Sequence, residues 1–150
     1  MSPSPALRHS LLVSAIMLQL GLALRRHRPG LQVVAEADWI VNRHTTLRPD
    51  LMVCRPINTK GWLEEAPLLV LEVLSPSTAE RDRTDKFDIC QEAGVTYFLL
   101  ADPDARTVEA HVLENGAYRP LVAVDNGLTF QLAGIEAGLD LAEVWAALPL

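Results

Sequence analysis

The sequence predicts an α/β (α+β) fold in which one mixed β-sheet is flanked by helices. The chain has 150 residues and is 49% hydrophobic, which is ordinary for one globular domain. Segment 5–27 is long, apolar and typical of a helix, whereas 67–74 and 96–101 are apolar runs typical of strands covered on both faces. No repeat or long linker interrupts the order helix, strands, helix, strands, so we expect a single domain over residues 1–150.

The first helix is predicted over 5–27 and ends at Pro29-Gly30. Its apolar run Leu11–Leu24 follows basic residues, so a signal peptide is the alternative. The run is shorter than the roughly 20 residues needed to span a bilayer, and no small-residue cleavage site follows it. We therefore expect a buried core helix and a cytoplasmic protein.

Short apolar runs predict strands at 31–35, 37–41 and 47–54, followed by a surface loop at 55–66 and the strand 67–74. Ser77 and Glu80 form a capping box that opens a second helix, and Gly94 closes it.

After the strand 96–101, Asn115-Gly116 predicts a type I′ hairpin between strands 107–113 and 117–124. A last strand near 128–132 is expected to lead into a short helix, with Asp140 and Glu143 as its capping pair.

Charge is distributed unevenly along the chain, whose net charge is −6. Residues 1–55 carry seven Arg against three acidic residues, a balance of +4, and the rest carries six basic and sixteen acidic residues, a balance of −10. The basic segment is a candidate phosphate-facing patch, and the alternative is a set of solvated side chains at a helix end.

The two cysteines, Cys54 and Cys90, both lie in apolar segments. Two buried free thiols in a reducing compartment are favoured over a disulfide between them. No CxxC pair or Cys/His cluster indicates zinc.

Glu72 is the most informative residue, because it lies in the run Leu68–Leu74, in which both alternating faces are otherwise apolar. A carboxylate in such a strand costs several kcal/mol unless it is paired, protonated or bound to a metal. The alternative is a Glu at the solvated end of the strand, or one paired with an Arg.

Asp50 occupies a comparable position at the start of the apolar strand before Glu72, although Pro49-Asp50 alone is a common turn. If the two strands are neighbours, the two carboxylates can converge on one hard cation such as Mg²⁺. We predict that they lie within about 6 Å of each other.

Asp82 and Lys86 have the i, i+4 spacing of one helical face, which continues through Ile89, Cys90 and Ala93. If the apolar end of this stripe packs on the sheet, its other end directs Asp82 and Lys86 toward Glu72. An exposed salt bridge between Asp82 and Lys86 is the alternative.

These residues also carry a resemblance to a known family. The motifs are Pro49-Asp50, Pro67 through Glu72-Val73-Leu74-Ser75-Pro76-Ser77-Thr78, Asp82 and Lys86, Gly94-Val95 and Asp102-Pro103, in that order. The segment 49–103 resembles the Uma-type restriction endonucleases, also called domain of unknown function 820, within the PD-(D/E)xK nuclease superfamily. The resemblance extends more loosely upstream to Ser2-Pro3-Ser4-Pro5 and His9, and downstream to the Asn115-Gly116 hairpin.

The resemblance implies a restriction-endonuclease-like fold and a Mg²⁺- or Mn²⁺-dependent endonuclease acting on nucleic acid, with DNA as the expected substrate. It implies that Asp50, Glu72 and the Val73 carbonyl ligate the metal and that Lys86 is the catalytic lysine. His9 and Asp82 are accessory candidates. The alternative is an inactive nuclease fold that serves as an interaction or dimerisation module.

The chain departs from the family pattern in three respects. The superfamily lysine position holds Leu74, so the lysine must come from the helix. An acidic segment that members carry ahead of Ser2-Pro3-Ser4-Pro5 is expected to be missing, and His9 is the nearest substitute for its Glu. Cys90 and the pair Phe98-Leu99 replace aromatic residues that affect packing.

We also predict a two-fold homodimer, because cutting both strands of a duplex requires two sites and symmetric dimers are the commonest oligomers. The expected interface is the apolar first helix with Leu11, Leu12, Ile16, Met17 and Leu20.

Overall fold

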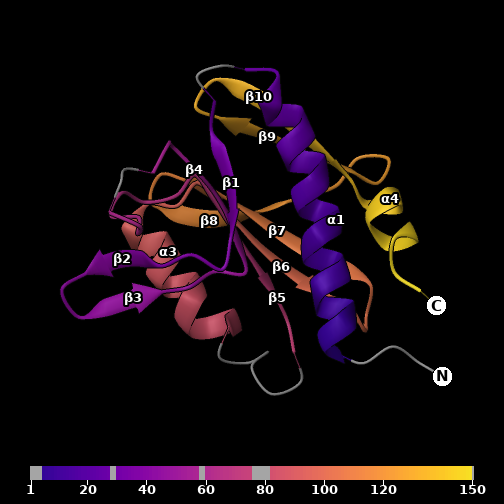
Figure 1. Ribbon diagram of the computed structural model, residues 1–150, viewed down its shortest axis with the longest axis horizontal. Helices are drawn as coiled ribbons and strands as arrows, with labels where there is room; N and C mark the ends of the chain where they lie inside the picture. Colours follow the sequence, from indigo (N-terminus) through magenta and orange to yellow (C-terminus); the bar gives the residue numbers. More distant parts are fainter. Residues whose placement is uncertain (1–4, 28–29, 58–59, 76–81, 150) are drawn as a thin grey trace.

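The computed structural model describes residues 5–27, 30–57, 60–75 and 82–149 (Figure 1). Its centre is a six-stranded sheet in the order β1-β4-β5-β6-β7-β8. The central pair β5–β6 is parallel and the other neighbours are antiparallel, so the predicted mixed sheet is confirmed. The strands are β1 (Gln32–Ala35), β4 (Leu51–Cys54), β5 (Leu69–Val73), β6 (Tyr97–Asp102), β7 (Thr107–Glu114) and β8 (Ala117–Leu121).

Helices and hairpins cover both faces of this sheet (Figure 1). On one face lie α1 (Pro5–Arg25), the hairpin of β9 (Gly127–Leu132) and β10 (Ile135–Asp140), and α4 (Leu141–Ala146). On the other lie α3 (Phe87–Ala93) and the hairpin of β2 (Trp39–Asn42) and β3 (Thr45–Leu47). The sheet thus separates two hydrophobic cores, which we call the α1-side core and the α3-side core.

The central strands β4, β5 and β6 are buried on both faces, as their continuous apolar sequences predict. In β5, Leu69, Leu71 and Val73 belong to the α1-side core, whereas Val70 belongs to the α3-side core. The alternation follows from the two-residue period of a strand. It also assigns Glu72 to the same side as Val70.

Helix α1 packs on the sheet through Leu12, Ile16, Leu20 and Leu24, each at most 1% exposed. Their i, i+4 spacing forms one stripe. Three of the five residues expected at a dimer interface cannot form it, because Leu12, Ile16 and Leu20 are buried in the chain's own core. The exposed leucines of the helix are instead Leu7, Leu18 and Leu22.

The length of α1 does not by itself distinguish a core helix from a membrane span. Residues Ala6–Arg25 are long and apolar enough to cross a bilayer, with a mean hydropathy of 1.5, and 28% of that window is buried. The argument from the shorter run Leu11–Leu24 was therefore wrong. The observation that supports a core helix is the buried stripe on the sheet.

The observed strands differ from the expected ones at two places. The single strand expected at 47–54 is divided, because β3 ends at Leu47 and β4 begins at Leu51. Pro49 lies between them, and proline lacks the N–H that a continuous ladder requires. Strand β10 was not predicted: it pairs with β9 through a tight turn in which Ala133 and Gly134 both have positive φ. Alanine seldom adopts that conformation, so the turn had a weak sequence signal.

The turn between β7 and β8 and the C-cap of α3 lie at the predicted residues. Asn115 and Gly116 both have positive φ and join β7 to β8, which confirms the hairpin. Gly94 ends α3 with φ 88°, as predicted. The capping box at Ser77 and Glu80 lies outside the described residues. Before α3, residues Asp82–Lys86 form a π-helix in place of the expected α-helix.

Helix α4 has its predicted N-cap, since the Asp140 carboxylate accepts hydrogen bonds from the N–H groups of Ala142 and Glu143. The reciprocal contact expected from the Glu143 side chain is replaced. Gln19 on α1 accepts from the Asp140 N–H at 2.7 Å and donates to its carbonyl at 3.0 Å. Both cysteines are buried and free, as predicted.

Candidate functional site

Glu72 is the buried charged residue of the fold, the one charged side chain under 9% exposed in the part of the chain that the structure describes. It lies on β5 with 2% of its surface exposed. Position 72 is close to the carboxyl end of the strand, which ends at Val73. A carboxylate held there needs a cation or hydrogen-bond donors to remain ionised.

Lys86 supplies that positive charge. Its Nζ lies 3.1 Å from Glu72 Oε2, and 23% of its side chain is exposed. The lysine is the last residue of the π-helix, directly before α3. π-Helical turns are rare and often occur at functional sites. The structure therefore brings together the two residues that the sequence separates by fourteen positions.

Phe87, the next residue, anchors this end of α3 to the sheet. Its ring makes edge contacts with Phe98, His111 and Tyr118, with centroid distances of 5.8, 5.2 and 5.1 Å. The Tyr118 hydroxyl donates to the Val95 carbonyl at 2.7 Å. These contacts limit how far the adjacent Lys86 backbone can move. The sequence offered no spacing signal for this cluster, because its rings come from separate elements.

Asp50 comes to the end of β5 from the neighbouring strand. The β4–β5 register pairs Leu51 with Leu71, so the next residues in line are Asp50 and Glu72. Asp50 Oδ2 accepts a hydrogen bond from the Val73 N–H at 2.7 Å. The aspartate carboxylate is therefore held against the backbone that follows Glu72.

His9 joins the same group from α1. Its Nε2 lies 3.2 Å from Asp50 Oδ1, with side-chain exposures of 29% and 20%. Helix α1 thus contributes one side chain to a group otherwise built on β4, β5 and the segment before α3. The side chain of Asp82 lies outside the described residues, so no contact is assigned to it.

The donor atoms around the end of β5 are of the type that a hard cation prefers. Asp50, Glu72 and the Val73 carbonyl offer oxygen atoms, which Mg²⁺ and Mn²⁺ prefer, and such sites complete their coordination with water and substrate phosphate. Within the described residues no three His, Cys, Asp or Glu side chains gather as a metal-binding group. Among the described residues, the two carboxylates and the Val73 carbonyl are the candidate donors.

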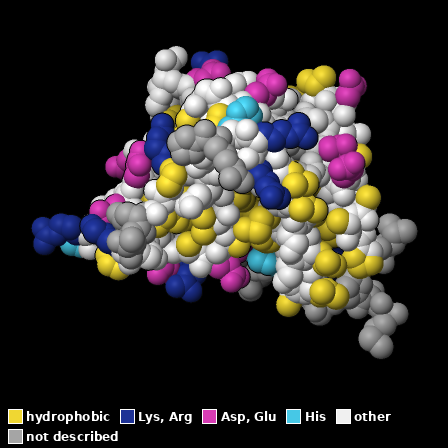
Figure 2. Space-filling model, turned by 45° about the horizontal axis from the view of Figure 1, so that its top comes forward, with side chains coloured by type: hydrophobic (Ala, Val, Ile, Leu, Met, Phe, Trp, Pro, Cys, Tyr) yellow, Lys and Arg dark blue, Asp and Glu magenta, His cyan; other side chains and the backbone are white. Residues whose placement is uncertain are grey.

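Three of the Arg residues in segment 1–55 form ion pairs with acidic side chains. Arg8, Arg48 and Arg55 pair with Asp104, Asp38 and Glu65 respectively. Figure 2 shows dark-blue Lys and Arg side chains interspersed with acidic and apolar ones on the face it displays. The acidic partners of these three residues offset part of the segment's balance of +4.

The family "Putative restriction endonuclease" (Uma2) has a model that matches residues 1–143. The chain belongs to this family. A crystal structure of a putative nuclease of DUF820 from Anabaena variabilis matches with a TM-score of 0.76 and 19% sequence identity. The match covers 99% of this chain and 86% of that one, which shows that the two share a fold. No curated protein matches the chain.

Proposed function

We propose that this Uma2-family protein is a metal-dependent endonuclease that hydrolyses phosphodiester bonds of nucleic acid, with DNA as the first substrate to test. The observation that carries the proposal is the buried Glu72–Lys86 pair beside Asp50. A buried ionised pair contributes little to stability compared with apolar packing. Its position at the end of two central strands, with His9 and Asp50 adjacent, supports a chemical role.

In the proposed site, Asp50, Glu72 and the Val73 carbonyl would hold Mg²⁺ or Mn²⁺. A bound metal of this kind lowers the pKa of a ligated water and stabilises negative charge on phosphate oxygens. The hydrogen bond from the Val73 N–H holds Asp50 Oδ2 in place. The Asp50 carboxylate therefore has a defined orientation, and its remaining lone pairs are available in fixed directions.

Lys86 is assigned to the charge that develops on the phosphate. Its ammonium carries three protons, of which one points to Glu72 in the observed contact. An ammonium at this position can donate to a phosphate oxygen or to the attacking water. Because 23% of its side chain is exposed while Glu72 is buried, Lys86 is also the member of the pair that substrate can reach.

His9 is assigned a positioning task through Asp50. Its imidazole contacts Asp50 Oδ1 while the Val73 N–H donates to Oδ2, so the carboxylate is held at both oxygens. Replacing His9 with Ala should loosen Asp50 and weaken divalent binding, without removing any donor oxygen of the proposed metal site.

A nuclease assay of the wild type and Glu72→Gln with Mg²⁺ or Mn²⁺, on matched DNA and RNA duplexes, tests the proposal. We expect divalent-dependent cleavage by the wild type and none by the variant. Calorimetric titration with Mn²⁺ gives an independent readout. Absence of both cleavage and divalent binding in the wild type would support the inactive interaction module instead.

We further propose a cytoplasmic two-fold homodimer, since a duplex presents two strands to be cut. With Leu12, Ile16 and Leu20 inside the core, the apolar surface that remains on α1 includes Leu18 and Leu22, which are 63% and 55% exposed. Light scattering should give twice 16.5 kDa, and Leu18→Glu should give the monomer mass. A wild-type monomer at micromolar concentration would reject the dimer.

A further inference from the structure

A hollow of about 260 Å³ lies next to the candidate site. It is bounded by the first turns of α1, by the residues that follow β5, and by the turn between β6 and β7. Its polar lining residues are Arg8, His9, Ser10, Ser75 and Asp104. This volume is somewhat below the roughly 300–1,000 Å³ of typical small-molecule pockets, so a small group suits it better than a whole cofactor.

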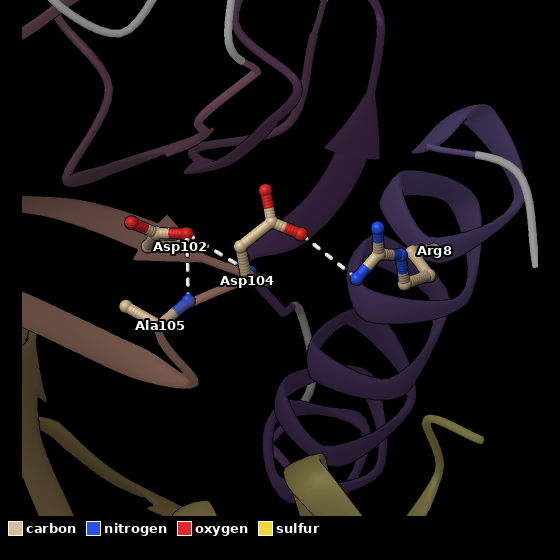
Figure 3. Close-up of polar contacts among 4 residues, drawn as sticks. All are labelled: Arg8, Asp102, Asp104 and Ala105. Atoms are coloured by element: carbon tan, nitrogen blue, oxygen red, sulfur yellow. Dashed lines mark hydrogen bonds and ion pairs between the residues drawn. The ribbon is translucent and has the colours of Figure 1, made fainter. Parts of the chain in front are cut away.

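Arg8 and Asp104 form the ion pair at this hollow (Figure 3). Arg8 Nη1 lies 2.8 Å from Asp104 Oδ1, and the Asp104 side chain is 57% exposed. The turn that carries Asp104 is fixed by Asp102, whose Oδ1 accepts from the N–H groups of Asp104 and Ala105 at 2.9 and 3.1 Å. The arginine thus meets an exposed carboxylate on a constrained turn.

The guanidinium of Arg8 has a further donor to satisfy. Its Nε is buried and has no hydrogen-bond partner among the residues that the structure describes. An unsatisfied buried donor is unfavourable, so such a group calls for an explanation. If the guanidinium turned from Asp104 toward an anion in the hollow, its Nε and Nη groups could donate together, because arginine binds phosphate in a bidentate manner.

The other features of the hollow also favour an anion. The first turn of α1 carries no acidic residue, and its N-terminus has the positive end of a 21-residue helix dipole. Ser10 and Ser75 bring hydroxyl groups to the lining, and Asp104 is the one carboxylate among its described residues. An incoming phosphate would therefore compete with a single exposed carboxylate.

The hollow is continuous with the candidate site through shared residues. His9 lines the hollow and contacts Asp50 at 3.2 Å. Leu74 and Ser75, which also line it, directly follow Val73. A group bound there would thus lie beside the proposed metal site at Asp50 and Glu72, on the α1 side.

We propose that this hollow binds a second phosphate group of the nucleic-acid substrate, with Arg8 as its principal ligand and Asp104 as the anion that it displaces. This inference rests on the proposed nuclease function, since it supplies that site with a substrate-positioning contact. The second phosphate is either an internal phosphodiester or a terminal phosphate monoester, which present the same oxygens.

Binding to a 5′-phosphorylated DNA duplex, measured in the Glu72→Gln background so that no strand is cut, tests this inference. We expect Arg8→Gln to weaken binding about tenfold and to reduce the salt dependence by about one counterion. Arg8→Lys should lie between, because it keeps the charge and loses the planar fork. Asp104→Asn should tighten binding, an opposite effect that a folding defect does not produce.

Arg26→Gln is the matched control, because it removes the same charge at the other end of α1, where Arg26 is exposed. Equal weakening by Arg8→Gln and Arg26→Gln would overturn the assigned subsite while leaving the nuclease proposal intact. Absence of duplex binding by the Glu72→Gln protein with Arg8 intact would instead contradict both the assigned subsite and the nuclease proposal. Repeating the series with a 5′-hydroxyl duplex identifies the source: an Arg8 effect confined to the phosphorylated duplex assigns a chain end, and an equal effect assigns an internal phosphate.

Discussion

The two faces of β5 are equally buried but chemically different. Toward α1 the strand presents Leu69, Leu71 and Val73, all within an apolar core. Toward α3 its sequence places Glu72 among apolar neighbours, where Lys86 reaches it. The comparison indicates that burial alone does not exclude a carboxylate. What decides is whether a neighbouring element brings a cation within contact distance.

Moving the carboxylate to the other face should have the largest effect. Leu71→Glu places a carboxylate at a fully buried position facing α1, and the buried side chains that the structure describes include no cation to pair with it. We expect a loss of about 4 kcal/mol or more in the free energy of unfolding. Glu72→Gln, one residue along, should cost less, about 1–3 kcal/mol, because Gln keeps a hydrogen-bonding oxygen and the Lys86 side chain is 23% exposed. Urea denaturation measures both, and similar losses would contradict the difference between the faces.

Removing the Lys86 ammonium should mainly slow cleavage. Lys86→Ala is expected to reduce cleavage about 100-fold, equivalent to about 2.7 kcal/mol, while leaving Mn²⁺ affinity nearly unchanged. Glu72→Gln should lose both cleavage and Mn²⁺ binding. Single-turnover cleavage and calorimetry separate the two effects. Full activity of Lys86→Ala would reduce Lys86 to a charge partner of Glu72.

The position of the ammonium can be tested by relocating it. Leu74 is two residues from Glu72, and its side chain is therefore expected on the same face of the sheet. Leu74→Lys combined with Lys86→Ala should restore part of the cleavage activity. It should also lower stability, because Leu74 is only 6% exposed. No recovery in a variant that remains folded would argue that the π-helix supplies more than a charge.

The aromatic anchor should have a smaller effect. Phe87→Leu removes three ring contacts next to Lys86, so we expect about 1 kcal/mol of lost stability and up to tenfold slower cleavage. Phe130→Leu is the matched variant on the α1 side, where the ring packs on Tyr97. It should lose similar stability without slowing cleavage. Equal slowing by both would indicate a general loss of rigidity.

The smallest expected effect is on the pH dependence of stability, through a thiol in the α3-side core. Burial, together with the nearby Glu72, raises the pKa of the Cys90 thiol from 9.0 to about 12. A raised pKa means that the folded state retains the proton, so this contribution to stability is complete below pH 9 and is lost toward pH 12. Cys90→Ala should flatten that part of the stability curve. An unchanged slope would show that the Cys90 thiol does not contribute to it.

The sequence determined the buried strands, the hairpin at Asn115-Gly116 and the unusual status of Glu72, because each depends on local period, turn chemistry or the cost of a buried charge. It also identified Asp50, Lys86 and His9 as candidates. It did not predict β10, whose turn needs a positive φ at Ala133. The π-helix before α3 was likewise not predicted, since an i, i+4 pattern assumes α-helical geometry.

Only the tertiary structure decided which candidates meet. Pairing of β4 with β5 brought Asp50 to the Val73 N–H, and packing of α1 and α3 on opposite faces brought His9 and Lys86 to the same strand end. The same packing placed Arg8 beside Asp104, ninety-six positions away in the chain. Contacts of this kind depend on how layers stack. A single sequence records the apolar faces that drive the stacking but not the side chains that the stacked layers bring together.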